Sequence, residues 1–168
     1  GIPLVEVEAG DLGAETATDA SAQGDAELEP LETALADLHE EMNIDGVTAG
    51  AVESEYQTSR IRGLCDRLGI ELYAPLWGRD PLELGREMVD AGFDVRVVQV
   101  AAAGLDESWL GRRLDGGALD DLRALNDEYG VHGLGEGGEF ETLVVDGPHM
   151  DRRIDLDYET EWDGIRGR

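Results

Sequence analysis

The chain has 168 residues, a length that suits one domain with a hydrophobic core, and 41% of them are hydrophobic. It carries 39 acidic and 13 basic residues, for a formal net charge of -26, and every basic residue is an arginine. This balance argues against a broad nucleic-acid surface and is typical of proteins in a salt-rich cytoplasm. No apolar run approaches the roughly 20 residues that cross a bilayer, so we expect a soluble cytoplasmic protein without membrane contact.

In chain order, the first half of the sequence predicts short strands alternating with helices. After the first strand, a polar stretch of small residues has no clear periodicity, so we expect a loop or a mobile flap there. Pro30 is expected to open the first helix, because proline is favoured in the first turn. The predicted elements are a strand at 2–7, the loop at 8–29, a helix at 30–42, a strand at 47–52, a helix at 54–68 and a strand at 70–73.

Cys65 lies within the helix predicted at 54–68 and is the only cysteine. A single cysteine excludes an intramolecular disulfide and a multi-cysteine metal site. Cys65 shares an apolar helical stripe with Ile61, Leu64 and Leu68. We therefore expect a core residue rather than a redox or nucleophilic group.

The second half continues the alternation. Asp80, Pro81 and Glu83 combine an N-cap, a first-turn proline and a capping-box-like acid, which predicts a helix start. The predicted elements are a helix at 80–91, an apolar strand at 93–100, an irregular stretch, a helix at 118–129 and a strand at 143–145. The order β-α-β-α-β-α-β predicts an α/β fold, a parallel sheet with helices on both faces, and ligands in the loops that follow the strands.

The run GEGGEFET, residues 135–142, sets three carboxylates among three glycines just before the last strand. Glycine lets the backbone adopt positive φ or approach a ligand closely. Glutamates this close repel one another unless a positive charge compensates them, so the run favours a cationic guest. The motif alone leaves an acidic surface turn open as the alternative.

The start of the helix at 54–68 offers a second candidate site. Ser54 and Gln57 fit a capping box, which is a structural role. The free N–H groups of a helix start also receive anions, and Arg60, one turn later, adds a charged fork for phosphate or carboxylate. The two roles are compatible.

Three further features each allow a structural and a functional interpretation. Trp77 is either a packing residue or a cation-binding face. The acids and bases of segment 105–113 either neutralise one another at the surface or contribute to a site. His132 has no partner at metal-ligand spacing, so no zinc site is expected.

Three segments, in this order, resemble the signature segments of one family: TAGAVESEYQTSRIRGLCDRLGIELYAPLWGRD, VAAAGLDESWLGRRLD and YGVHGLGEGGEFETLVVDGP. The family is the diphthine–ammonia ligases, a branch of the PP-loop ATP pyrophosphatases, and the lysine-free composition resembles that of a haloarchaeal member. The resemblance implies a PP-loop α/β fold. In it, residues 1–73 are the remainder of the nucleotide-binding domain and residues 74–168 are a small C-terminal α/β substrate-binding region.

The resemblance also implies a reaction, that of an ATP-dependent, AMP-forming C–N ligase. Family members activate the carboxylate of diphthine, a modified histidine on translation elongation factor two, as an acyl-adenylate, and ammonia then gives the amide diphthamide. ATP and Mg2+ are implied as cofactors, elongation factor two and ammonium as partners, and homo-oligomer formation stays open. Diphthine carries a trimethylammonium group and the nitrogen arrives as ammonium, so both suit carboxylates and an aromatic face.

From the resemblance and this chemistry together we predict three sets of site residues. The catalytic set, which holds the cationic substrate or ammonium, is Glu136, Glu139 and Glu141. The nucleotide-binding set is Gly50, Ser54, Tyr56, Gln57 and Arg60. The substrate-binding set is Trp77, Asp106, Ser108, Trp109, Gly135, Gly137, Gly138 and Thr142, with one of the tryptophans supplying a cation–π surface.

One feature departs from the family pattern. Members begin with a strand and a glycine-rich SGGKDS loop that cradles the ATP phosphates, and this sequence contains no such segment. We therefore expect a fragment that is inactive alone, because little in it would hold the triphosphate, and that exposes a sheet edge. Two alternatives stay open: a PP-loop protein acting on another small carboxylate, and a non-catalytic adenylate-binding or partner protein.

Overall fold

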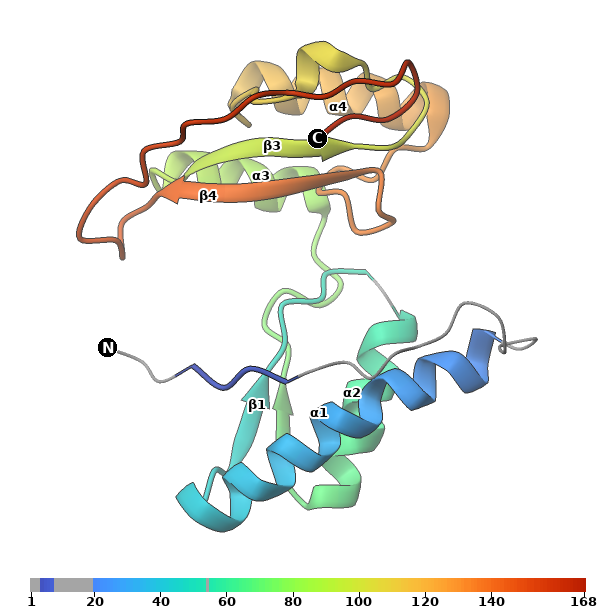
Figure 1. Cartoon of the computed structure of the whole chain (residues 1–168), viewed down its shortest axis with the longest axis vertical. Helices are drawn as coiled ribbons and strands as arrows, with labels where there is room; N and C mark the ends of the chain where they lie inside the picture. The colour runs from blue at the N-terminus through green and yellow to red at the C-terminus, as the bar shows by residue number, and fades with distance from the viewer. Residues whose placement is uncertain (1–3, 8–19, 54) are drawn as a thin grey trace. The chain divides into compact units, whose positions relative to one another are not determined.

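The computed structural model describes residues 4–7, 20–53 and 55–168, without the side chains of residues 20–27, 56 and 57. The chain forms two compact units, Gly1–Trp77 and Gly78–Arg168, each with its own hydrophobic core (Figure 1). Each unit combines helices with a two-stranded sheet, so the predicted α/β class is confirmed. No helix within the described ranges is long and apolar enough to cross a membrane.

The first unit packs two helices on a short parallel sheet. Its elements are α1 Ala20–Met42, β1 Gly46–Thr48, α2 Glu55–Leu68 and β2 Glu71–Tyr73. β1 and β2 run parallel, with Val47 opposite Leu72, as expected for strands joined through a helix. Apolar residues of both helices and both strands pack around buried Leu64, Cys65 and Ile70.

Cys65 occupies the core position that the helical stripe predicts. Its residue surface is 1% exposed. Burial, followed by the negative charge of Asp66, raises the pKa of its thiol, so the reactive thiolate is disfavoured. A packing role therefore accounts for this residue.

The prediction that residues 8–29 form a loop is wrong for residues 20–29, which belong to α1. Pro30 lies inside this helix rather than at its start. An interior proline costs a helix roughly 3 kcal/mol, but the flanking Ala, Glu, Gln and Leu residues are strong helix formers and continue the helix through it. Residues 8–19 of the predicted loop lie outside the described residues. Residues 4–7 were predicted as part of a strand, but they form no strand or helix in the structure.

The second unit contains α3 Pro81–Asp90, β3 Asp94–Val100, the 3-10 helix η1 Glu107–Trp109, α4 Gly116–Tyr129 and β4 Phe140–Asp146. The predicted cap of α3 is confirmed, because the Asp80 side chain accepts the Glu83 N–H at 2.8 Å. Asp115 caps α4 in the same way, accepting the Ala118 N–H at 2.9 Å. Both helices thus begin where a short acidic side chain can satisfy a free N–H group.

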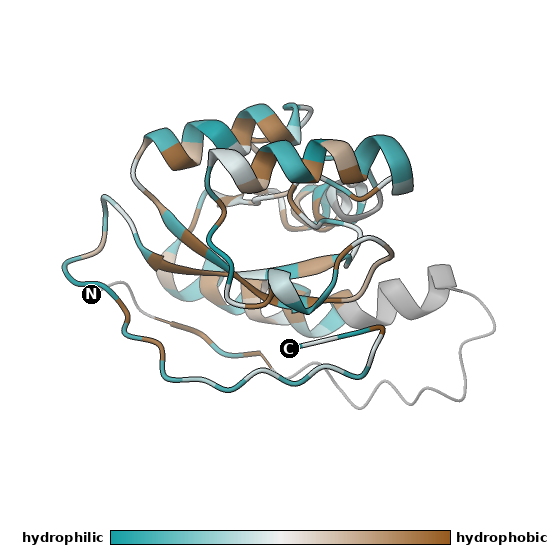
Figure 2. Cartoon of the chain, turned by 90° about the horizontal axis from the view of Figure 1, so that it is seen from above, coloured by the Kyte–Doolittle hydropathy of each residue, from teal (hydrophilic) through white to brown (hydrophobic). Residues whose placement is uncertain are grey.

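The core of the second unit joins residues from every one of its elements. Leu82 of α3 and Leu119 of α4 pack with Val97 of β3, Trp109 of η1 and Phe140 of β4, all of them buried. Along the helices, hydrophobic and hydrophilic residues alternate (Figure 2). This pattern is the one that turns a single helical face toward a core.

The prediction of one parallel sheet is wrong for the last two strands, because β3 and β4 form a separate two-stranded sheet in which they run antiparallel. The cause is the segment before α4, for which the sequence predicts an irregular stretch. This segment runs back along β3: the Gly111 N–H donates to the Val97 carbonyl, and the Leu114 N–H donates to the Val95 carbonyl. By the start of α4 the chain has therefore returned to the start of β3. After α4, β4 begins next to the end of β3 and so runs antiparallel to it.

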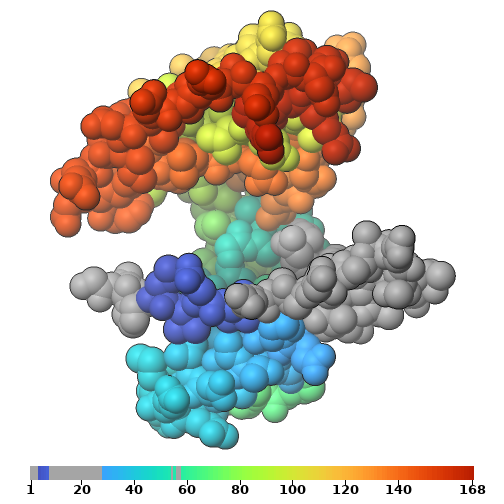
Figure 3. All heavy atoms as spheres, viewed as in Figure 1, coloured from blue at the N-terminus to red at the C-terminus, as the bar shows by residue number. Residues whose placement is uncertain are grey.

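After β4 the chain turns back once more and reaches the other edge of β3. The Ile154 N–H donates to the Val145 carbonyl at 2.8 Å. Near the C-terminus, Gly167 and Val100 exchange two backbone hydrogen bonds of 2.9 and 3.0 Å. Figure 3 shows this last segment in red across the visible face of the second unit.

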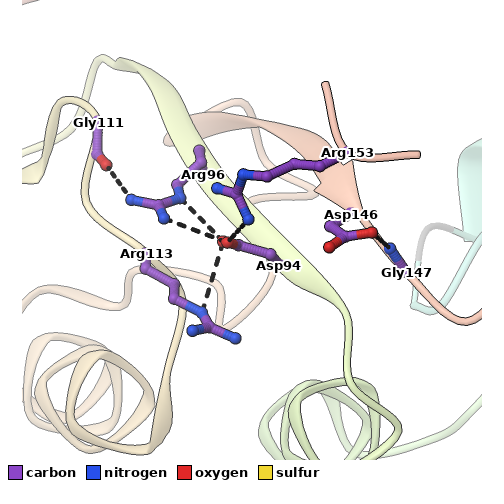
Figure 4. Close-up of polar contacts among 7 residues, drawn as sticks. All are labelled: Asp94, Arg96, Gly111, Arg113, Asp146, Gly147 and Arg153. Atoms are coloured by element: carbon purple, nitrogen blue, oxygen red, sulfur yellow. Dashed lines mark hydrogen bonds and ion pairs between the residues drawn. The ribbon is translucent and has the colours of Figure 1, made fainter. Parts of the chain in front are cut away.

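Three arginines converge on the buried side chain of Asp94 at the start of β3 (Figure 4). The nitrogen–oxygen distances are 2.8 Å from Arg96, 3.4 Å from Arg113 and 2.6 Å from Arg153. Burial by itself would raise the pKa of Asp94, but the hydrogen bonds from Arg96 and Arg153 and the arginine charges outweigh it, so the pKa lies below its ordinary value. The cluster ties β3 to the segment before α4 and to the C-terminal segment.

Candidate functional site

Two of the predicted site segments meet at one end of the β3–β4 ladder. Val100, the last residue of β3, lies opposite Phe140, the first residue of β4. The loop that follows β3 leads into η1, and the loop that precedes β4 contains residues 135–139 of the glutamate-rich run, whose last three residues begin β4. The Ala101 N–H donates to the Glu139 carbonyl at 2.8 Å, which joins the two loops.

The segment 132–139, here called the glutamate loop, is built from tight turns. Gly135 has φ of +76° and Gly138 has φ of +81°, conformations that favour glycine. At Gly135 a Cβ would also lie 2.4 Å from the Phe140 carbonyl oxygen, so no larger residue fits without a shift. Gly137 allows the Glu139 carboxylate to lie close above it, because a Cβ there would be 2.6 Å from Oε1.

The Glu139 carboxylate turns into the glutamate loop. Its Oε1 accepts the backbone N–H of His132 at 3.1 Å. Its Oε2 is buried and has no hydrogen-bond partner in the described part of the chain. A buried carboxylate oxygen without a donor costs free energy, so this oxygen is suited to accept a hydrogen bond from a bound positively charged group.

The other two glutamates differ in their surroundings. Glu136 is mostly buried, with a side chain 20% exposed, and its Oε2 lies 4.0 Å from His132 Nε2. Glu141 and Thr142 lie exposed on β4. The structure therefore brings Glu136 and Glu139 together around His132, while Glu141 stands on the strand beside them.

Asp106 and Ser108 satisfy each other in the loop that follows β3. The Asp106 carboxylate accepts the Ser108 hydroxyl at 2.5 Å and the Ser108 N–H at 2.9 Å, which caps η1. The Ser108 hydroxyl first and its N–H second lower the pKa of Asp106. Both residues are exposed, so the cap is open to a further ligand.

The two candidate tryptophans have different environments. Trp109 is 5% exposed, and the Arg112 guanidinium carbon lies 4.2 Å from the centre of its ring. That ring already contacts a cation of its own chain and packs in the core. Trp77, the last residue of the first unit, is only partly buried.

The acids and bases of segment 105–113 do not simply neutralise one another. Arg112 pairs with Asp121 of α4 at 2.5 Å, and Arg113 pairs with Asp94 of β3. These ion pairs join the segment to neighbouring elements. The arginines therefore have structural partners outside the segment.

The predicted nucleotide-binding residues belong to the first unit. Gly50 follows β1, and a Cβ there would meet nothing within 4 Å. Tyr56 and Gln57 lie in the first turn of α2, Arg60 lies half-buried in the next turn, and Ser54 is outside the described residues. The start of α2 thus offers backbone N–H groups and a guanidinium, which suit a phosphate or an adenylate.

Two residues with unusual surroundings were missed by the sequence interpretation. Thr58 of α2 is 3% exposed, and its Oγ1 is buried without a hydrogen-bond partner in the described chain. Its position between Gln57 and Arg60 was the available signal. His132 contacts the partly buried Glu136 and Glu139, but from the sequence it was considered only as a metal ligand.

The described residues include groups that suit the phosphates of ATP but no group that suits Mg2+. The α2 start and Arg60 provide the donors that a nucleotide phosphate accepts. Within the described residues, no group of three or more His, Cys, Asp and Glu side chains is arranged to hold a metal ion. We therefore assign no residue to Mg2+ and no chemical step to it.

Comparison with known proteins identifies both halves of the chain. A family model for the diphthamide synthase N-terminal domain matches residues 1–72, and one for the diphthamide synthase C-terminal domain matches residues 80–168. Relatives named diphthine–ammonia ligase include proteins from Danio rerio, 41% identical over 132 residues, and Homo sapiens, 38% identical over 137 residues. A Schizosaccharomyces pombe protein of the same name is 40% identical over 114 residues.

The matched region makes up a larger share of this chain than of the relatives. The matches cover 78% of this chain for the Danio rerio protein and 80% for the human protein, but 51% and 50% of those relatives. For the Schizosaccharomyces pombe protein they cover 68% of this chain and 19% of the relative. The chain thus spans about half the length of the vertebrate relatives. With both domain models matched in order, the chain belongs to the diphthamide synthase family.

Proposed function

We propose that the complete protein is a diphthine–ammonia ligase, which amidates diphthine on translation elongation factor two to diphthamide. ATP activates the diphthine carboxylate as an acyl-adenylate, ammonium supplies the nitrogen, and AMP and pyrophosphate leave. Membership of the diphthamide synthase family and the names of the relatives support this proposal. The acidic, lysine-free composition supports a cytoplasmic location in a salt-rich cell.

The observation that carries the proposal is the buried, unpartnered Oε2 of Glu139. Ammonium can donate a hydrogen bond to this oxygen, whereas a trimethylammonium group has no N–H to donate. Glu139 therefore suits the incoming nitrogen. The trimethylammonium group of diphthine suits an open anionic or aromatic surface, such as Glu141 on β4 or Trp77.

The proposed reaction uses the glutamates to hold a proton as well as a charge. Ammonium must lose one proton before its nitrogen can attack, and a carboxylate beside it can accept that proton. The nitrogen then forms the C–N bond at the activated carbonyl carbon while the bond to AMP breaks, and a second proton leaves to give the neutral amide. Glu136, which like Glu139 lies next to His132, adds negative charge that favours ammonium at this place.

The proposed division of labour places the nucleotide in the first part of the chain and the substrate in the second. We assign residues 1–73 to the nucleotide side, with Gly50, Ser54, Tyr56, Gln57 and Arg60 near the nucleotide and the activated carboxylate. ATP is the cofactor that this assignment requires, whereas Mg2+ would accompany the ATP phosphates without a ligand assigned to it among the described residues. Residues 74–168 form the substrate side, where the remaining members of the substrate set are Asp106, Ser108, Trp109, Gly135, Gly137, Gly138 and Thr142.

The test compares Glu139→Gln with Glu159→Gln in the complete protein at high salt. Both changes remove one negative charge, but Glu159 is exposed in the C-terminal segment and outside the proposed site. With ATP, ammonium and elongation factor two that carries diphthine, Glu139→Gln should lower amide formation by about 100-fold or more, because the nitrogen donor is misplaced. Mass spectrometry of the modified peptide and the release of AMP measure the reaction.

Three outcomes have separate meanings. Full activity of Glu139→Gln would remove this residue from the site. A complete protein that forms AMP with a small carboxylate but never yields diphthamide would favour a PP-loop enzyme with another substrate. Nucleotide binding without AMP formation would favour an adenylate-binding partner protein.

A further inference from the structure

Three successive backbone N–H groups of the glutamate loop all donate to one residue, His132. The Leu134 N–H and the Glu136 N–H donate to its ring nitrogen Nδ1, at 3.1 and 3.2 Å. Between them, the Gly135 N–H donates to its carbonyl oxygen at 3.1 Å. His132 therefore satisfies the donors of the turn that carries Glu136.

These contacts determine which nitrogen of the ring carries the proton. An imidazole nitrogen accepts hydrogen bonds only when it has no proton of its own. Because two N–H groups point at Nδ1, the proton must lie on Nε2 and the ring must be neutral. The Nε2–H then faces Glu136, whose Oε2 is 4.0 Å away. Protonation of Nδ1 would set an N–H against two other N–H groups and break the turn.

The same residue also holds Glu139, the second glutamate of the loop. Its main-chain N–H donates to Glu139 Oε1, which leaves Oε2 as the free acceptor. The His132 side chain is itself mostly buried, at 17% exposed. Gly133 next to it packs on Leu82 of α3, where a Cβ would lie 2.9 Å from that side chain. His132 is thus anchored on one side and contacts both glutamates on the other.

We propose that His132 is a positioning residue for amidation: its neutral, Nε2-protonated imidazole holds the turn that carries Glu136, and its main-chain N–H holds Glu139, in the geometry that receives the nitrogen donor. This inference rests on the proposed function. It assigns to His132 no contact with the substrate and no proton transfer. Its consequence is that the acceptor at the Nδ1 position matters more than the volume of the ring.

Matched substitutions separate these two requirements. The amide oxygen of an asparagine at position 132 can occupy the place of Nδ1, whereas that of a glutamine reaches the place of Nε2. In the complete protein, His132→Gln and His132→Ala should lower kcat for amidation by about 100-fold, while His132→Asn should keep at least about ten times the activity of His132→Gln. KM for ATP should be unchanged in all three. Equal losses in Asn, Gln and Ala variants, with intact circular dichroism spectra, would overturn the positioning role.

The tautomer can be measured independently of activity. Long-range nitrogen–proton NMR spectra distinguish a protonated Nδ1 from a protonated Nε2. His39 is a built-in contrast, because its Nδ1 lies 2.7 Å from the Ile44 carbonyl oxygen and must donate to it. We expect opposite tautomers for the two residues, with the His132 signals identified by their loss in His132→Asn. A protonated Nδ1 at His132 would overturn the proposal.

The two readouts also separate this inference from the proposed function. If the wild-type complete protein forms no diphthamide, the proposed function fails, and the positioning role fails with it, even where the predicted tautomer is found. If the wild-type protein is active and asparagine is no better than glutamine, only the positioning role fails.

Discussion

Glu139 shows how much a single residue depends on its neighbours for a chemical role. Its spacing from Gly135, Gly137 and Glu136 predicts a turn with crowded carboxylates. Spacing does not predict that one oxygen accepts the His132 N–H while the other is buried without a partner. That asymmetry arises because the turn folds the carboxylate over Gly137. The residue type was predictable, and its surroundings were not.

Two helical glycines provide a residue-scale prediction about packing. At Gly85 in α3 a Cβ would lie 2.8 Å from Leu119, a fully buried side chain of α4, whereas at Gly63 in α2 the nearest atom would be 3.6 Å away. Alanine usually stabilises a helix by roughly 0.5–1 kcal/mol relative to glycine. Crowding at position 85 should outweigh this gain and lower the free energy of unfolding by about 1 kcal/mol.

Denaturant titrations of Gly85→Ala and Gly63→Ala, followed by circular dichroism, measure the two changes. Gly63→Ala serves as the control, because it should stabilise the protein by about 0.5–1 kcal/mol. A stabilising Gly85→Ala would show that Leu119 moves aside and that α3 and α4 are not closely packed.

At the scale of elements, the Asp94 cluster joins β3 to segments that are not strands of its sheet. β3 has β4 on one side, and on the other, among the residues that the structure describes, it has the segment before α4 and the end of the chain. Arg113 and Arg153 come from the segment before α4 and from the C-terminal segment, and both reach the same carboxylate. Ion pairs thus add to the backbone hydrogen bonds between β3 and the segment before α4, and they also join the C-terminal segment to β3.

Asp94→Asn should lower the free energy of unfolding at neutral pH by about 2 kcal/mol. This estimate is below the roughly 3–5 kcal/mol for breaking a fully buried pair, because Arg113 and Arg153 are close to half-exposed. The folded-state pKa of Asp94 lies below its unfolded value, so its contribution is complete above about pH 4 and is lost as the pH falls through the lower folded pKa.

Unfolding of wild type and Asp94→Asn should therefore be compared across an acidic pH series. Their difference should be constant above about pH 5 and should shrink below about pH 4. Asp127→Asn is the control, because Asp127 is exposed on α4 and its replacement removes the same charge. A difference that persists unchanged at the lowest pH would show that the asparagine acts through packing rather than through the lost charge.

Across the whole molecule, the dominant property is the net charge of -26. Such charge density opposes the compact state by mutual repulsion, and salt reduces it because the screening length falls from about 10 Å at 0.1 M to about 3 Å at 1 M. The thermal unfolding midpoint should therefore rise steadily between about 0.1 and 2 M KCl. Tetramethylammonium chloride at equal ionic strength should act similarly if screening is the cause. A midpoint that is flat or falls with KCl would contradict this account.

The sequence by itself determined the features that depend on residues close together in the chain. The Asp80 cap, the apolar stripe around Cys65, the α/β class and the family membership follow from local periodicity and motif order. The tertiary structure decided what joins distant segments: the antiparallel direction of β4, the arginines around Asp94, and the contacts of His132 with Glu139. The reason is physical, because pairing direction and buried charge depend on where the chain returns, and local sequence does not encode that path.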